Sequence, residues 1–227
     1  MVQRPLYGPE GQAVVVLLTP AGALFDGDAL PLHVSCGPGS DVTLASASAT
    51  KLNRCERAHI AFSLDVDVSD GATFRYLVYE LIPFRGTKYV QSIHLLLHGH
   101  AGASLLEVIG PGPTYDPFSY DRLDLETEVR QDDAVIVRER FVMTHGSVAQ
   151  LRGHTHYGSL MAFGANATAE QVNEHLADLP CDDVAGASEL AKGGVGLKML
   201  GHSAQSVRET LLRAAGAPPW LTSALPP

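Results

Sequence analysis

The stretch IAFSLDVDV, from Ile60 to Val68, decides the fold class. Its apolar residues alternate with small or charged ones, and this spacing sends the two kinds of side chain to opposite faces of a pleated strand. The same alternation runs from Leu123 to Arg130, and a further strand is predicted from Ala134 to Met143 after the turn at 131–133. We therefore predict strands with one solvent-exposed face. The strands at 123–130 and 134–143 are predicted to form a hairpin.

Other strands are predicted on both sides of this stretch, each bounded by Gly, Pro or Asp. They are Ala13 to Thr19, Asp28 to Ser35, Asp41 to Ser46, Thr73 to Leu81, Lys88 to Leu97 and Ala103 to Ile109. No helical pattern separates them, which favours antiparallel layers or a coiled β solenoid over βαβ units. The sequence shows no repeat of fixed period, so the layered and the β-helix-like alternatives stay open.

Helices are predicted only in the C-terminal half. Thr168 begins a capping-box pattern and predicts a helix from about Ala169 to Asp178. Ser203 is the expected cap of a second helix, from about Ala204 to Ala215. The fold class is therefore mainly β: many short strands in a layered or β-helix-like core, with about two α-helices.

The length of 227 residues predicts one domain, 1–227, with a β core at about 12–165 and a helix-containing part at about 166–218. Hydrophobic residues make up 45% and charged residues 18%, which suits a sizeable core. A net charge of −9 without a basic cluster argues against a nucleic-acid partner. We expect Cys36, Cys55 and Cys181 to be buried structural thiols.

The longest apolar run, Ala13 to Leu18, is far shorter than the roughly 20 residues that span a bilayer. No basic segment leads into a cleavable apolar region. We therefore expect a cytoplasmic protein that has no membrane partner.

Ten histidines raise the question of a metal site. His94, His98 and His100 would share one face of an extended strand and could hold Ni²⁺ or Zn²⁺. Because a turn follows at Ala101-Gly102, structural or solvated histidines are favoured over a metal site. His154 and His156, beside His145, form a second cluster of histidines. This cluster is predicted to lie in a glycine-rich loop, which makes it a weaker candidate for a metal site.

Two rows of acidic residues could line a cation path: Asp65 with Asp67, and Asp124 with Glu126 and Glu128. Like charges in a row more often form the solvated face of a strand, and we favour that interpretation. The common nucleophile, metalloprotease and phosphate-loop motifs are missing from the sequence. The glycine-rich segment 193–196 follows an apparently helical stretch and is interpreted as a loop.

Several segments, taken in order, resemble the UreD (UreH) family of urease accessory proteins. They are the glycine-rich opening Gly22–Asp28, the stretch Leu44–Arg54, the element Leu81–Phe84, and Glu107 three residues before Gly110. The resemblance covers about Ala21 to Met143.

The resemblance implies an all-β, β-helix-like core carrying two helices, and a scaffold or chaperone rather than an enzyme. It implies that the protein binds a UreF-type helical partner and, through it, a UreG-type GTPase, and docks them on apo-urease for nickel insertion. No permanently bound cofactor is implied, only transient Ni²⁺. Asp28 and Glu107 would then be buried oxygen ligands on an ion path. The alternatives are a turn role for Asp28 and a hydrogen-bonded buried carboxylate for Glu107.

Two other functions stay open at this point. The first is a small metal-dependent β-barrel enzyme that uses His94, His98 and His100, which would need the three imidazoles to converge on one point. The second is a plain protein-binding β module whose exposed apolar patch is its interface.

Overall fold

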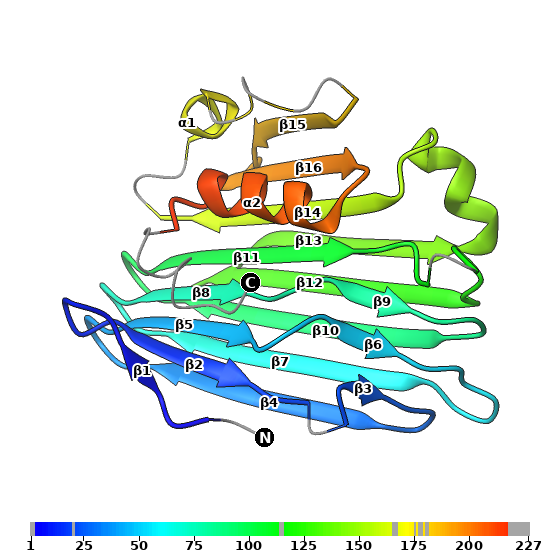
Figure 1. The fold of residues 1–227 in the computed structure, drawn as a ribbon. Helices are drawn as coiled ribbons and strands as arrows, with labels where there is room; N and C mark the ends of the chain where they lie inside the picture. Colours follow the sequence, from blue (N-terminus) through cyan, green and yellow to red (C-terminus); the bar gives the residue numbers. More distant parts are fainter. Residues whose placement is uncertain are drawn as a thin grey trace.

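The computed structural model describes residues 3–19, 21–113, 116–164, 168–174, 176, 179 and 182–217. The fold is mainly β and consists of two stacked sheets, with the two α-helices on the outer face of the larger sheet (Figure 1). The predicted fold class is therefore confirmed.

The small sheet has five strands in the order β13-β12-β10-β7-β4. Their bounds are β4 Ala29–Cys36, β7 Ile60–Val68, β10 Lys88–Leu97, β12 Arg122–Gln131 and β13 Ala134–Thr144. Strands β4, β7, β10 and β12 run parallel, whereas β12 and β13 are antiparallel. The hairpin predicted from the alternating pattern is thus present.

The large sheet has 11 strands, eight of them in the order β1-β2-β5-β8-β11-β14-β16-β15. These eight are β1 Leu6–Tyr7, β2 Ala13–Leu17, β5 Asp41–Ser46, β8 Thr73–Leu77, β11 Gly102–Ile109, β14 His156–Phe163, β15 Val184–Glu189 and β16 Val195–Gly201. Three short strands join beside this path: β3 Ala23–Leu24, β6 Thr50–Leu52 and β9 Leu81–Pro83. Strands β2, β5, β8 and β11 are parallel, and β14, β16 and β15 add to them antiparallel.

The chain coils between the two sheets. It runs through β2, β3 and β4, then through β5, β6 and β7, then through β8, β9 and β10, and each turn of the coil pairs in parallel with the one before. Strands β11 and β12 continue the coil before the antiparallel strands close the fold. Of the two architectures that the sequence left open, the solenoid-like one describes the parallel part.

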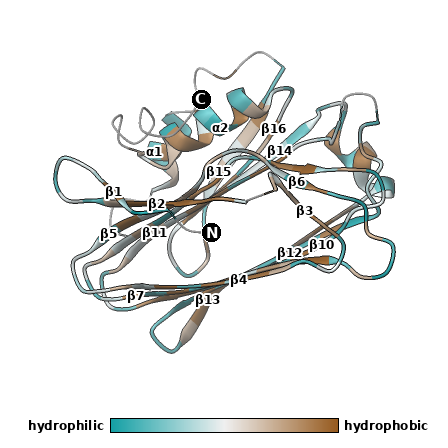
Figure 2. Cartoon of the chain, turned by 60° about the horizontal axis from the view of Figure 1, so that its bottom comes forward, coloured by the Kyte–Doolittle hydropathy of each residue, from teal (hydrophilic) through white to brown (hydrophobic). Residues whose placement is uncertain are grey.

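The main core lies between the sheets. The apolar residues of the deciding stretch, Ile60 to Val68, all point inward, and Ile60, Leu64 and Val68 have no exposed surface. Figure 2 shows apolar colouring along the strands of both layers and on the side of the helices that faces the large sheet. Cys36 and Cys55 are buried and free, as predicted, whereas Cys181 lies outside the described residues.

The two α-helices cover the outer face of the large sheet: α1 Ala169–Glu174 and α2 Ala204–Ala214 (Figure 2). The Ser203 hydroxyl accepts from the Ser206 N–H, so the predicted cap of α2 is confirmed. Of the remaining positions predicted for the first helix, 175, 177 and 178 lie outside the described residues. A 3₁₀ helix, η1 His145–Leu151, connects β13 to β14. Within the described part of the chain, no helix has the length and apolar character that crossing a bilayer requires.

Strands β15 and β16 correct the interpretation of segment 193–196. Gly193 and Gly194 form the turn between them, and Val195 and Gly196 already belong to β16. The stretch before the turn is strand β15, so the expected helical context is wrong. Val195, Leu197 and Met199 alternate toward α2, where they are fully buried.

Strand β4 forms one edge of the small sheet. The Ala61 N–H donates to the Asp28 carbonyl over 2.8 Å, and Ala29 lies opposite Ala61 in the parallel register. In a parallel pair, backbone groups of successive residues point alternately toward and away from the partner strand. The backbone of Pro31 therefore faces the outer edge, where none of the described strands pairs with β4.

Candidate functional site

A row of polar side chains lies inside the fold, on the inner face of the large sheet. Glu107 of β11 pairs with Ser159 of β14, and Ser159 pairs with Lys198 of β16, so the three stand side by side. Thr127 and Glu139, which pair with each other across β12 and β13, face this row from the small sheet. Together these five residues line a small pocket between the sheets, and we call them the inter-sheet polar cluster.

Glu107 is held by a chain of hydrogen bonds from the small sheet. The Gln91 amide donates to the Glu107 carboxylate, and the Tyr89 hydroxyl donates to the Gln91 side-chain oxygen over 2.9 Å. Burial raises the pKa of Glu107, although the hydrogen bond from Gln91 and the nearby charge of Lys198 oppose that rise. Glu107 is therefore a carboxylate whose charge is disfavoured by its position and whose orientation is fixed.

Lys198 is surrounded by oxygen atoms. Its Nζ lies 2.6 Å from Glu139 Oε1, 2.7 Å from Glu139 Oε2 and 2.8 Å from Ser159 Oγ. It also lies over the Tyr157 ring, 5.8 Å from its centroid. Burial disfavours the charged amine, but Tyr157 and Glu139 outweigh it and hold the pKa of Lys198 above its usual value. Lys198 therefore carries an ammonium at neutral pH and joins the two sheets.

Asp28 lies in a different place from Glu107. It is exposed, and it ends a turn in which its carboxylate accepts from the Phe25 N–H over 2.8 Å. The expectation that Asp28 is a buried acid is therefore wrong, because the turn places it at the end of the small sheet rather than inside it. The neighbouring Asp26 accepts from the N–H groups of residues 56, 57 and 58 instead, and these bonds lower the pKa of Asp26.

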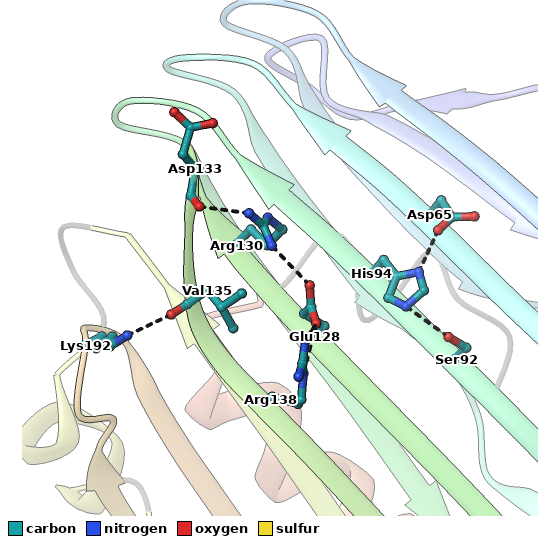
Figure 3. A network of polar contacts seen from close by, with 9 residues as sticks. All are labelled: Asp65, Ser92, His94, Glu128, Arg130, Asp133, Val135, Arg138 and Lys192. Atoms are coloured by element: carbon teal, nitrogen blue, oxygen red, sulfur yellow. Dashed lines mark hydrogen bonds and ion pairs between the residues drawn. The ribbon is translucent and has the colours of Figure 1, made fainter.

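The three histidines of the strand-and-turn segment do not converge. Each imidazole lies next to a different carboxylate: His94 is 2.9 Å from Asp65, His98 is 3.1 Å from Asp67, and His100 is 3.3 Å from Asp70. Figure 3 shows the His94 ring between Asp65 of β7 and Ser92 of its own strand. In the described ranges of the chain, no three His, Cys, Asp or Glu side chains are arranged to hold a metal ion.

The second histidine cluster is also dispersed. His154 stacks on His202 with ring centroids 4.8 Å apart, and its two ring nitrogens lie near the carbonyls of Leu151 and Asp182. His145 instead contacts the Phe118 carbonyl over 3.0 Å. Burial lowers the pKa of His156. These contacts are those of structural histidines.

The two acidic rows lie on the outer face of the small sheet, as favoured from the sequence, where Asp65 and Asp67 lie beside histidines and Asp124 and Glu128 beside arginines. The register places five side chains next to one another across the strands: His33, Asp65, His94, Glu128 and Arg138. Glu128 contacts both Arg130 and Arg138 (Figure 3). Because histidines and arginines separate the acids, the row avoids the repulsion that like charges on adjacent strands would cause.

The inter-sheet polar cluster was mostly missed from the sequence. The family resemblance points to Glu107, whereas no motif in the sequence marks Lys198 or Glu139. Lys198 alternates with Leu197 and Met199 just after the segment 193–196, which is interpreted as a loop, and no strand is predicted there from the sequence. Glu139 lies between two arginines of β13 and has the appearance of a surface residue.

Comparison with known proteins identifies a family whose model matches nearly the whole chain. The family model described as UreD urease accessory protein matches residues 1–225. The chain belongs to the UreD family.

Individual relatives agree with this assignment. A urease accessory protein UreD from Pseudomonas putida is 30% identical over 219 residues, which cover 94% of this chain and 77% of the relative. The UreD proteins of Lachnoclostridium phytofermentans and Actinomyces naeslundii are 25% and 29% identical. The first match covers 91% of this chain and 79% of the relative, and the second covers 82% and 72%. The predicted family is therefore confirmed for this UreD-family chain.

Proposed function

We propose that this UreD-family chain is a scaffold that assists nickel insertion into urease and passes Ni²⁺ through the space between its sheets. The observation that carries the nickel path is the position of Glu107, whose fixed carboxylate faces a pocket shared with Glu139 and Ser159. Oxygen ligands of this kind bind Ni²⁺ without the affinity of a closed nitrogen or sulfur cage. Such ligands suit a protein that must release the ion again.

Asp28 has a separate place in this proposal. Its exposed carboxylate is not part of the inter-sheet polar cluster, and a role for it as an oxygen ligand on the ion path stays a prediction. The interior part of the path therefore depends on Glu107 rather than on Asp28.

We further propose that the partners are a UreF-type helical protein, a UreG-type GTPase bound through it, and apo-urease. The family assignment supports this, since its members carry the description of urease accessory proteins. The test is co-purification of the tagged chain with these three proteins when all are co-expressed. Failure to recover any of them, together with unchanged urease activity in a strain that lacks the gene, would reject the proposal.

Replacement of Glu107 tests the nickel path. We expect Glu107→Ala to lower both the nickel content and the activity of urease in a strain that depends on this chain. The matched control is Glu126→Ala, which removes the same charge from β12 on the opposite face of the small sheet. Urease that is activated equally by the two variants would contradict an ion path through Glu107.

The two alternative functions are less well supported. A metal-dependent enzyme that uses His94, His98 and His100 requires convergent imidazoles, whereas each of these rings lies beside a different carboxylate. A plain protein-binding β module differs from the leading proposal only in its partner. Recovery of stable complexes that contain no urease protein would favour the module.

A further inference from the structure

Lys198 occupies the kind of position that a metal ion would take inside the fold. Its Nζ lies within 2.8 Å of three oxygen atoms: the two carboxylate oxygens of Glu139 and the hydroxyl oxygen of Ser159. Both carboxylate and hydroxyl oxygens also serve as ligands of divalent cations. The ammonium and a divalent ion would therefore compete for the same donors.

The two carboxylates of the pocket can accommodate a divalent ion in place of the ammonium. Glu107 and Glu139 both line the pocket, and Lys198 is the cation among its lining residues. When Glu107 is ionised, two carboxylates face one ammonium, so one negative charge is left without compensation in a partly buried site. A divalent ion in place of the ammonium would neutralise both carboxylates.

The two sides of the pocket differ in how firmly they are held. Glu107 is fixed by the Gln91 amide, which is itself held by Tyr89. Lys198 has a long flexible stem and a side chain that is 40% exposed, so its head can swing to solvent while β16 stays in place. Lys198 is thus the removable member of the cluster, and Glu107 is the fixed one.

We propose that the Lys198 ammonium is a removable plug of the inter-sheet path, and that a divalent cation displaces it to bind between Glu139 and Glu107. This inference rests on the proposed nickel path and adds a gate to it. The plug explains how two carboxylates can stand near each other inside the fold before an ion arrives. It also keeps the pocket closed to cations until Lys198 moves.

The experiment measures binding of Ni²⁺, and of Co²⁺ as a spectroscopic probe, to the purified full-length chain. Lys198→Met removes the ammonium but keeps most of the stem, and we expect its Kd for Ni²⁺ to fall about tenfold, which corresponds to about 1.4 kcal/mol. The matched control is Lys192→Met. The Lys192 ammonium also reaches β13, but it contacts the Val135 carbonyl rather than a carboxylate (Figure 3). This control should bind Ni²⁺ as the unmodified chain does.

Two double variants locate the gained site. Adding Glu107→Gln or Glu139→Gln to Lys198→Met should abolish the gain in affinity, since each removes one of the two carboxylates. If Lys198→Met is unstable without metal, Lys198→Gln replaces it, and the readout becomes the rise in Tm on addition of Ni²⁺. The proposal would be overturned if Lys198→Met folds but binds Ni²⁺ no more tightly than the unmodified chain. It would also be overturned if the gain in Ni²⁺ affinity persists in both double variants.

The outcome separates this inference from the proposed function. Tighter Ni²⁺ binding by Lys198→Met, combined with normal urease activation by Glu107→Ala, would support the cation site and reject the nickel path. Loss of urease activation by Glu107→Ala, combined with unchanged Ni²⁺ binding by Lys198→Met, would support the nickel path and reject the role of Lys198 as a plug.

Discussion

Phe141 of β13 stacks on Tyr157 of β14, with ring centroids 4.2 Å apart and ring planes 10° apart. The two rings belong to different sheets and lie beside the inter-sheet polar cluster. They therefore form an aromatic contact between the sheets next to the contact that Lys198 makes with Glu139.

Removing this stack should destabilise the closed fold. We expect Phe141→Ala to lower the free energy of unfolding by about 1–3 kcal/mol, because it removes a partly buried ring and its aromatic partner contact. Chemical denaturation measures the change. Phe25→Ala serves as the control, since Phe25 is 49% exposed and its loss should stay within about 0.5 kcal/mol. Equal effects of the two substitutions would show that the stack contributes nothing.

Stability should depend on pH through Glu107. Burial raises its pKa above the ordinary value of 4.5, so the folded state holds this proton more tightly than the unfolded state. The resulting stabilisation is complete below pH 4.5 and is lost as the pH rises through the folded-state pKa. Glu107→Gln carries no titrating proton and can still accept from Gln91. We therefore expect Glu107→Gln to be more stable than the unmodified chain at pH 8, with a difference that shrinks toward pH 4.5.

Denaturation across this pH range is the measurement for Glu107. Glu174→Gln, at an exposed position of α1, is the control and should leave the pH profile unchanged. A Glu107→Gln profile parallel to that of the unmodified chain would show that the carboxylate is not desolvated.

Helix α2 packs closely on β14 at Gly158. A Cβ added there would lie 2.5 Å from Val207 Cγ1 and 3.0 Å from Leu211 Cδ1, so these buried side chains of α2 would have to shift. We expect Gly158→Ala to cost about 1–3 kcal/mol of stability through this overpacking. Gly186→Ala in β15 is the matched control, because a Cβ there meets nothing within 4 Å. A Tm for Gly158→Ala equal to that of Gly186→Ala would contradict the packing described here.

Asp124 is held between two arginines on the outer face of the small sheet. Arg140 donates two hydrogen bonds to it, both over 2.8 Å, and Arg122 donates two more, over 2.7 and 3.2 Å. Arg140 and Arg122 together hold the pKa of Asp124 well below its usual range. The stability that these bonds supply is present above the unfolded-state pKa of about 4 and is lost as the pH falls through the lower folded-state pKa.

We expect Asp124→Asn to cost about 1 kcal/mol at pH 7, a modest value because both arginines are exposed to solvent. The cost should diminish when denaturation is repeated in acid, below pH 4. In a double-mutant cycle with Arg140→Met, the two effects should not add. Full additivity would mean that the pair is not coupled.

The longer parallel strands of the coil could be predicted, β7 and β12 from their alternation and the others from the Gly, Pro or Asp residues that bound them, whereas the short strands β3, β6 and β9 were not predicted separately. Strand β7 was placed at its observed bounds, Ile60 to Val68, since its apolar side chains enter the core and its acids do not. Strands β15 and β16 were missed because they are short and rich in small residues, and their glycine turn has the appearance of a loop. The long-range pairing of β16 with β14 decides their conformation, and local sequence does not encode it.

The candidate site required the three-dimensional register. Glu107, Ser159 and Lys198 are far apart in the sequence and meet only because three strands pair in one order. Alternation alone could not show that the polar member of β16 points inward. Conversely, His94 and His98 share one strand segment, but the sequence could not show that acids of β7 already pair with both.

Proline 31 on the outer edge of β4 has a consequence for the solubility of the whole molecule. A coil of parallel strands ends in a row of open amide and carbonyl groups, which a second copy of the chain could use to continue the ladder without limit. A proline in that row offers no N–H, so the edge lacks one donor near the start of β4. The first turn of the coil is therefore a poorer template for edge-to-edge pairing with a second copy than the same strand without proline would be.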